Sequence, residues 1–186
     1  MILIDMPPRY PRVALQPRRA KPRLGHPAYE EEVMSRKKRI HRKLGDVIAV
    51  PLRDGLFGYG RVLREPLIAF YNLQSSEPLP LEKIVLAPVA FVLFVMNSAI
   101  IDGDWSVLGN IPLSADLLQE PLFFKKDSIT GALSTYRDST GEETPATREQ
   151  CKGLECAAVW EPNHIADRLS DLFSGRRNMW VDDLQA

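Results

Sequence analysis

The stretch that decides the fold is GDVIAVPLRDGLFGYGRVL, residues 45–63. From Asp46 to Leu52 it is rich in β-branched residues and has a proline near its end, a pattern typical of a strand. The tripeptide Arg53-Asp54-Gly55 carries an Asp-Gly turn signal, and apolar residues return from Leu56 to Leu63. These residues therefore predict a β-hairpin.

Glycines on either side of Tyr59 predict a bulge or a sharp bend in the second strand of this hairpin. Residues 67–73 predict a third strand. Three short strands rich in glycine indicate a strongly bent, mixed or antiparallel sheet, in the form of a small, partly open barrel. Further along, the pattern predicts a short helix at 80–86, a central strand at 89–96 that is apolar on both faces, a helical turn at 114–118, and strands at 122–125 and 132–136.

The C-terminal third is predicted to be helical. Thr147-Arg148-Glu149-Gln150 matches a capping box, and a stripe at Cys151, Leu154 and Ala158 extends this helix. Pro162 fits the first turn of a second helix that stops at Gly175, and Trp180 is expected to dock in a last turn. The apolar face of the second helix carries Ile165, Leu169, Leu172 and Phe173. The predicted fold class is α+β, with C-terminal helices packed on a bent sheet.

The charges are split between two parts of the chain. Residues 1–43 hold 12 Lys/Arg and 4 Asp/Glu, and residues 44–186 hold 12 and 20, which gives net charges of +8 and −8. Six prolines lie within residues 1–29, so residues 1–43 are predicted to be a basic, Pro-rich, disordered arm. Residues 44–186 are predicted to form a single α+β domain. A basic arm favours nucleic acid or a membrane surface, whereas an acidic domain favours a basic protein partner.

The arm has two other interpretations. The first is a solvated tail, because no aromatic residues lie within the basic run at 36–43 for base stacking. The second is a translated leader. Met34-Ser35-Arg36-Lys37-Lys38 looks like an ordinary bacterial protein start, and the residues Glu30-Glu31-Glu32-Val33 can be encoded by a purine-rich run that resembles a ribosome-binding site. We therefore hypothesise that residues 1–33 are a translated leader. A native N-terminus at Met1, found by mass spectrometry, would contradict this hypothesis.

Several classes of protein are disfavoured. The longest apolar run, Val89 to Val95, is far shorter than the ~20 residues of a membrane helix, and residues 1–4 are too short for a signal peptide, so a cytoplasmic protein without a membrane partner is expected. Cys151 and Cys156 are spaced so that they do not share a helix face, which argues against a disulfide or a metal pair. Phosphate-binding, zinc-protease and nucleophile-elbow motifs are absent from the sequence, so no catalytic residue, cofactor or metal is predicted.

Three groups of residues are candidates for a function. Asp102-Gly103-Asp104-Trp105 could bind a hard cation, form a turn with Trp105 as a core plug, or present Trp105 as an anchor for a basic partner. Glu142-Glu143 is expected to be a solvated hairpin end. His164 could act as a general base, and the alternative is a partly exposed histidine that bonds within the first turn of its helix.

The segments Gly45–Leu52, Gly58–Leu63 and Ala69–Tyr71 resemble the immunity protein 26 family, whose members are bacterial proteins encoded beside polymorphic toxins. The runs Pro145–Glu149 and Ala157–Trp160 fit the same pattern, so that the resemblance extends over about Arg36 to Leu184. It implies an α+β domain that binds and neutralises a cognate toxin. It brings no catalytic residue with it.

The first function expected is therefore that of a non-catalytic immunity protein in a one-to-one complex with its toxin. Its acidic surface would suit a basic nuclease. The alternative is a nucleic-acid-associated small-barrel module that uses the basic arm, and the third is a hydrolase built on His164 and nearby carboxylates. The residues expected to contact the toxin are Asp102, Asp104, Trp105, Glu142 and Glu143.

Overall fold

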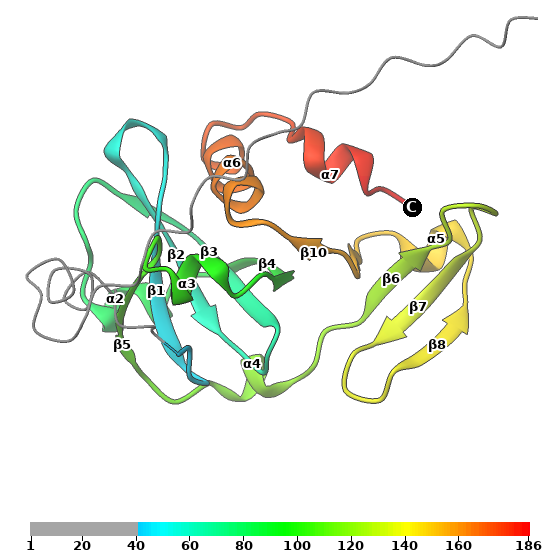
Figure 1. The fold of residues 1–186 in the computed structure, drawn as a ribbon, viewed down its shortest axis with the longest axis horizontal. Coiled ribbons are helices and arrows are strands. Elements are labelled where there is room, and N and C mark those ends of the chain that lie inside the picture. Colours follow the sequence, from blue (N-terminus) through cyan, green and yellow to red (C-terminus); the bar gives the residue numbers. More distant parts are fainter. Residues whose placement is uncertain (1–40) are drawn as a thin grey trace, which may run out of the picture. The chain divides into compact units, whose positions relative to one another are not determined.

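The computed structural model describes residues 41–186 of the chain (Figure 1). It contains two β-sheets and several short helices, which confirms the predicted α+β fold class. No helix in the described part of the chain is long and apolar enough to span a membrane. Of the predicted N-terminal arm, all but residues 41–43 lies outside the described residues, and so does the whole hypothetical leader.

The first sheet has six strands in the order β10-β4-β3-β2-β1-β5. All neighbours are antiparallel except β10 and β4, which run parallel. The sheet does not close into a barrel, because β10 and β5 are its two edges. The strands are β1 Asp46–Pro51, β2 Phe57–Val62, β3 Leu67–Ser75, β4 Val89–Val95, β5 Ser106–Asn110 and β10 Val159–Trp160.

The predicted hairpin is β1 and β2, joined by the 3-10 turn η1 Arg53–Gly55. Ala49 lies opposite Tyr59, and the turn places Asp54 at φ 61° and Gly55 at φ 72°, the left-handed region that glycine and aspartate tolerate. The pairing of β2 with β3 shifts register between Gly58 and Gly60. The bulge predicted at Tyr59 is therefore present.

The second sheet has four strands in the order β8-β7-β6-β9. Its strands are β6 Phe123–Lys126, β7 Leu133–Arg137, β8 Glu142–Pro145 and β9 Glu155–Cys156. The helices are α2 Leu81–Val85, α3 Ser98–Ile101, α4 Ala115–Leu118, α5 Arg148–Cys151, α6 Pro162–Phe173 and α7 Met179–Asp183.

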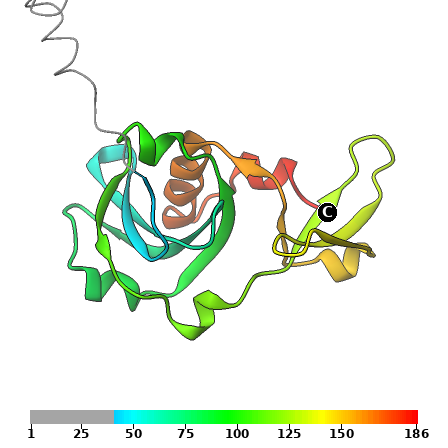
Figure 2. The same ribbon diagram turned by 60° about the horizontal axis from the view of Figure 1, so that its bottom comes forward.

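One face of the six-stranded sheet packs against α3 and α6, and residues of α7 pack on the same apolar cluster. Figure 2 shows α6 lying along this face. The other face is covered by α2 near Tyr59 and Tyr71. It is covered further along by residues of α4 and by Phe123 of the second sheet. The cluster under α3 and α6 contains Ile48, Val50, Val62, Ile68, Phe70, Phe91, Leu93, Val95, Ala99, Ile100, Trp105, Trp160, Ile165 and Leu169.

One prediction of secondary structure was wrong, and a second is confirmed only in part. The capping box at Thr147 is present, but its helix ends at Cys151, because Gly153 takes φ 80° and residues 155–156 instead pair in parallel with Phe123 and Phe124. The strand β4 lies between β3 and β10, as the prediction of a central strand requires, although β10 pairs only with its last two residues and Val89 at its start is exposed. In both places a partner from a distant part of the sequence decides the structure.

Candidate functional site

The turn between α3 and β5 carries the Asp102–Trp105 cluster. The backbone N–H of Asp102 closes α3 by donating to the Ser98 carbonyl at 2.8 Å, and Gly103 follows with φ 80°. Trp105 is 3% exposed and meets the Phe70 ring edge to face, with centroids 6.0 Å apart. The indole is therefore a core plug, and a partner at this turn would meet the exposed side chains of Asp102 and Asp104.

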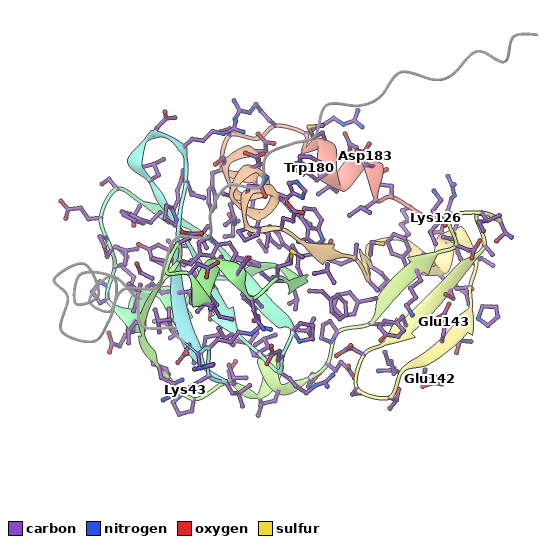
Figure 3. The ribbon with its side chains drawn as sticks, viewed as in Figure 1. Lys43, Lys126, Glu142, Glu143, Trp180 and Asp183 are labelled. Atoms are coloured by element: carbon purple, nitrogen blue, oxygen red, sulfur yellow. The ribbon has the colours of Figure 1, made fainter. Side chains whose placement is uncertain are left out.

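The second predicted contact, Glu142-Glu143, lies on the edge strand β8 (Figure 3). Both residues are exposed, but Glu143 accepts hydrogen bonds from Ser134 Oγ at 2.6 Å and from Lys125 Nζ at 3.0 Å. These bonds, first that of Ser134 and then that of Lys125, hold the pKa of the Glu143 carboxyl below its usual range. Glu143 is thus paired within its own sheet, and Glu142 is the other exposed carboxylate of β8.

The five predicted contact residues do not form one cluster. Asp102, Asp104 and Trp105 lie in the turn that precedes β5 of the six-stranded sheet, whereas Glu142 and Glu143 belong to the four-stranded sheet. Their role in binding a partner stays a prediction. Within residues 41–186, no group of three or more His, Cys, Asp or Glu side chains is placed to hold a metal ion.

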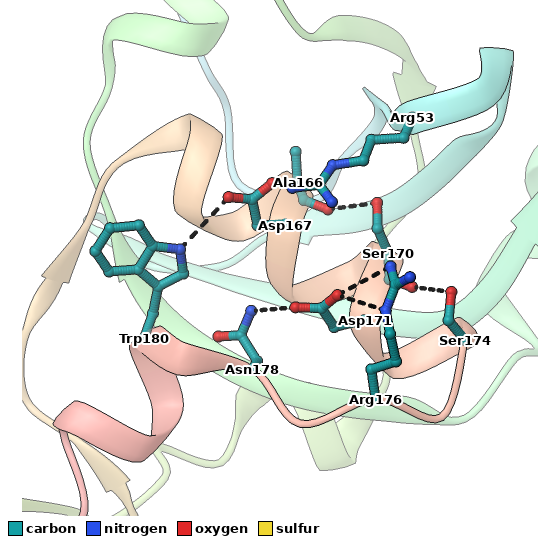
Figure 4. A network of polar contacts seen from close by, with 9 residues as sticks. All are labelled: Arg53, Ala166, Asp167, Ser170, Asp171, Ser174, Arg176, Asn178 and Trp180. Atoms are coloured by element: carbon teal, nitrogen blue, oxygen red, sulfur yellow. Dashed lines mark hydrogen bonds and ion pairs between the residues drawn. The ribbon is translucent and has the colours of Figure 1, made fainter.

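Other acids of the C-terminal helices are engaged in a polar network between α6 and α7 (Figure 4). Asp167 pairs with Arg53 of the β1–β2 turn and lies 3.5 Å from Trp180 Nε1. Asp171 accepts from Asn178 Nδ2 at 2.9 Å and from Arg176 Nε at 3.2 Å. These two carboxylates therefore hold α7 and the hairpin against α6, and contribute less to a free acidic surface than the sequence suggested.

His164 stacks on Trp180, with ring centroids 3.7 Å apart and planes at 24°. Both rings line a small hollow of about 210 Å³ together with Asp183. The observed contact of His164 is that of an aromatic ring that packs α7 against α6.

Two arginines with structural roles were missed by sequence reasoning. Arg61 of β2 is buried and donates through Nη2 to the carbonyls of Ile111 and Pro112, which fixes that loop over the sheet. Arg168 of α6 makes a two-pronged pair with Glu155, at 2.9 Å and 2.6 Å. The position of Arg61 in an otherwise apolar strand is a sequence signal for its burial, but no local pattern marks Arg168.

Comparison with known proteins gives one match. The family model described as Immunity protein 26 matches residues 43–133, the part that contains β1 to β5, β6 and the first residue of β7. No curated protein and no solved structure matches the chain. The match includes the glycine-rich hairpin that carried the resemblance, and it ends before the second pair of runs, at 145–149 and 157–160.

Proposed function

We propose that the chain acts by binding alone. Over residues 43–133 it belongs to the Immunity protein 26 family, and this family implies a toxin-neutralising role. It forms a one-to-one complex with a cognate bacterial toxin in the cytoplasm and blocks the toxin without carrying out chemistry. The family match is the observation that carries this proposal. The structural features below bear on where the contact lies.

The toxin proposed is a basic nuclease, met by an acidic surface. The net charge of −8 over residues 44–186 supports this choice, because a nuclease is basic where it binds phosphate and opposite charges accelerate association. The proposed centre of the contact is the α3–β5 turn, where the side chains of Asp102 and Asp104 are both exposed, and Glu142 on the exposed strand β8 is a second point.

The test uses the toxin domain encoded beside this gene, with association followed by stopped-flow fluorescence at rising salt. The double variant Asp102→Ala/Asp104→Ala is expected to associate several-fold more slowly than the wild type at low salt, and the difference should shrink as salt screens the charges. The control is Glu77→Ala/Glu82→Ala, which removes the same charge from exposed positions at and before α2. Equal slowing by both variants would leave only a general effect of net charge and would reject the assigned contact.

Purification of the native protein from its host tests the alternative function. Native protein that carries nucleic acid in place of a toxin would overturn the immunity proposal and would assign the function to the basic residues 1–43. Co-purification of a stoichiometric toxin domain, and protection of cells that express both proteins, are the results expected here.

A further inference from the structure

Within residues 41–186 the two sheets have four edge strands, and β5 differs from the other three. The strands β9 and β10 are two residues long, and β8 carries Pro145 together with two carboxylates. Short length, proline and charge are features that keep a sheet edge from pairing with another chain. The strand β5 is five residues long, and its sequence Ser-Val-Leu-Gly-Asn contains neither a proline nor a charged residue. It is therefore the edge best suited to accept another strand.

The outer side of β5 presents main-chain groups to solvent. The N–H of Ile111, directly after β5, points inward and donates to the Gly45 carbonyl at 3.1 Å. Because successive residues of a strand turn their main-chain groups to opposite sides, those of Asn110 point away from β1. Asp46, which lies opposite Asn110, donates its own N–H to the Lys43 carbonyl at 3.0 Å. Asn110 is exposed, and within residues 41–186 its N–H has no acceptor, so this edge can still form main-chain hydrogen bonds.

The two faces of β5 are packed although its edge is open. Val107 packs on the apolar cluster under α3 and α6, and Leu108 packs on the cluster under α2. A Cβ atom on Gly109 would lie 2.6 Å from Leu81 Cδ1, so the glycine allows α2 to approach the strand closely. The pairing of β5 with β1 shifts register once along its length. The strand is thus held in place before a partner arrives, which lowers the entropy lost on binding.

The charge beside β5 indicates which kind of strand the edge fits. Asp104 lies two residues before the first residue of β5, and both Asp104 and Asp102 are exposed. Two residues of a strand span about 7 Å, so a side chain of an added strand can reach the Asp104 carboxylate. Opposite charges on neighbouring strands stabilise their pairing, and like charges destabilise it. The edge therefore favours a segment with a basic side chain at this end.

We propose that the edge of β5 receives an extended segment of the toxin, which adds to the six-stranded sheet as an antiparallel strand and carries a lysine or arginine at its end nearest Asp104. This inference rests on the proposed function and deepens it, because it joins the acidic turn and the sheet edge in one contact. The whole of β5 lies within the family-matched residues 43–133. The charge of the turn speeds the approach of the toxin, and the main-chain hydrogen bonds along β5 slow its release.

The first measurement is amide hydrogen exchange of the full chain by ¹⁵N NMR, with and without the toxin domain encoded beside this gene. The Asn110 N–H is expected to exchange fast in the free protein, and to exchange at least about tenfold more slowly in the complex, where it is hydrogen-bonded. The N–H of Ile111, which is bonded to Gly45 in the free protein, is the reference for a protected amide.

The control amide is that of Val159, on the opposite edge of the same sheet. The Trp160 carbonyl accepts from the Met96 N–H at 3.1 Å and so points toward β4, which turns the main-chain groups of Val159 outward. Val159 is 60% exposed. Its amide should exchange at the same rate with and without the toxin, because the proposed contact lies at β5.

Two substitutions at one residue then separate the main chain from the side chain. Asn110→Pro removes the outward N–H, and with it the side-chain bonds to the Leu44 carbonyl and to Asp46 Oδ1. Asn110→Ala loses the same side-chain bonds but keeps the N–H, so it is the matched control. The toxin is expected to dissociate about tenfold faster from the proline variant than from the alanine variant, with association rates that agree within about twofold. The ¹⁵N spectrum of each variant establishes that it is folded.

The outcomes separate this inference from the proposed function. An Asn110 amide already protected in the free chain would overturn the inference, in favour of residues 1–40 if the protection is independent of concentration and of a second copy if it grows with concentration. A bound toxin that leaves the Asn110 amide unprotected, or that leaves the proline and alanine variants at equal rates, would overturn this inference alone. Failure of every form of the protein to bind the toxin would instead overturn the proposed function, and with it the identity of the added strand.

Discussion

Residues 43–133 and residues 134–186 contribute unequally to the apolar core. The first region supplies most of the buried apolar side chains, arranged on the two faces of the six-stranded sheet. The second region contributes only Cys151, Trp160, Ile165 and Leu169 to the buried apolar side chains of the described residues. Trp160, Ile165 and Leu169 pack in the same cluster as the first region, and the pair of Asp167 with Arg53 adds a polar contact. The family-matched region thus supplies most of the core, and the rest is attached to it by a few apolar side chains together with polar contacts.

The two regions meet at Arg168. Its guanidinium lies 4.0 Å from the Phe91 ring centroid of β4 and 5.0 Å from that of Trp160 in β10, while its pair Glu155 belongs to β9 of the other sheet. One side chain therefore joins α6 to both sheets. This geometry suggests that the two regions unfold together although they are built differently, and the substitutions below test that expectation from the largest effect to the smallest.

The largest effect is expected in the apolar region. Phe70 is fully buried against Phe91 and Trp105, with ring centroids 5.4 Å and 6.0 Å away, so Phe70→Ala should cost about 3–5 kcal/mol of unfolding free energy. Urea denaturation followed by tryptophan fluorescence measures this loss, because Trp105 reports on the first region and Trp160 and Trp180 on the second. A single shifted transition is expected. Two separate transitions would show that the two regions unfold independently and would contradict the expectation that they unfold together.

A smaller effect is expected from the contact that joins the regions. Glu155→Ala leaves Arg168, whose side chain is 11% exposed, without its carboxylate, and should cost about 1–3 kcal/mol. The control is Glu149→Ala, since the pair of Glu149 with Lys152 is 3.9 Å long and exposed on both sides, and its loss should stay within about 0.5 kcal/mol. Equal stabilities of the two variants in urea would mean that Arg168 does not tie the regions together.

A local contact inside the second region should matter less again. Thr147 accepts a hydrogen bond from the Gln150 N–H at 3.3 Å, and the Gln150 side chain accepts from the Thr147 N–H at 2.8 Å. Thr147→Ala should cost about 1 kcal/mol, whereas Thr147→Ser keeps the hydroxyl and most of the stability. Faster amide hydrogen exchange at Gln150 in the alanine variant alone is the expected measurement. Unchanged exchange would indicate that tertiary contacts hold α5 without its cap.

The features that the sequence predicted depend on local signals, whereas the ones it missed depend on contacts between distant parts of the chain. The hairpin at 45–63, the cap at Thr147 and the helix from Pro162 to Gly175 depend on signals a few residues apart, and all three are present. The helix expected through residues 152–158 failed because β9 finds its partner in β6, far back in the chain.

The same contrast between local signals and distant partners applies to the candidate site. The exposed acids at 102 and 104 were predicted from their own turn. The pairing of Asp167 with Arg53 joins residues far apart in the sequence, and no local pattern predicts it.

The smallest effect is expected on the pKa of one carboxyl group in the second region, that of Glu143. Ser134 and Lys125 hold the pKa of Glu143 low by hydrogen bonding to its charged form, so Ser134→Ala should raise that pKa toward the ordinary glutamate value, as followed by ¹³C NMR of the side-chain carboxyl. Thr135→Ala, which removes a hydroxyl from the next residue of β7, is the control and should leave the pKa unchanged. Because the folded pKa is depressed, the stability that this bond contributes is present above the unfolded pKa and is lost as pH falls through the folded one. The stability difference between wild type and Ser134→Ala should therefore narrow in acid. A difference that stays constant with pH would mean that Ser134 acts through packing in β7, and that in this hairpin too the apolar contacts outweigh the polar ones.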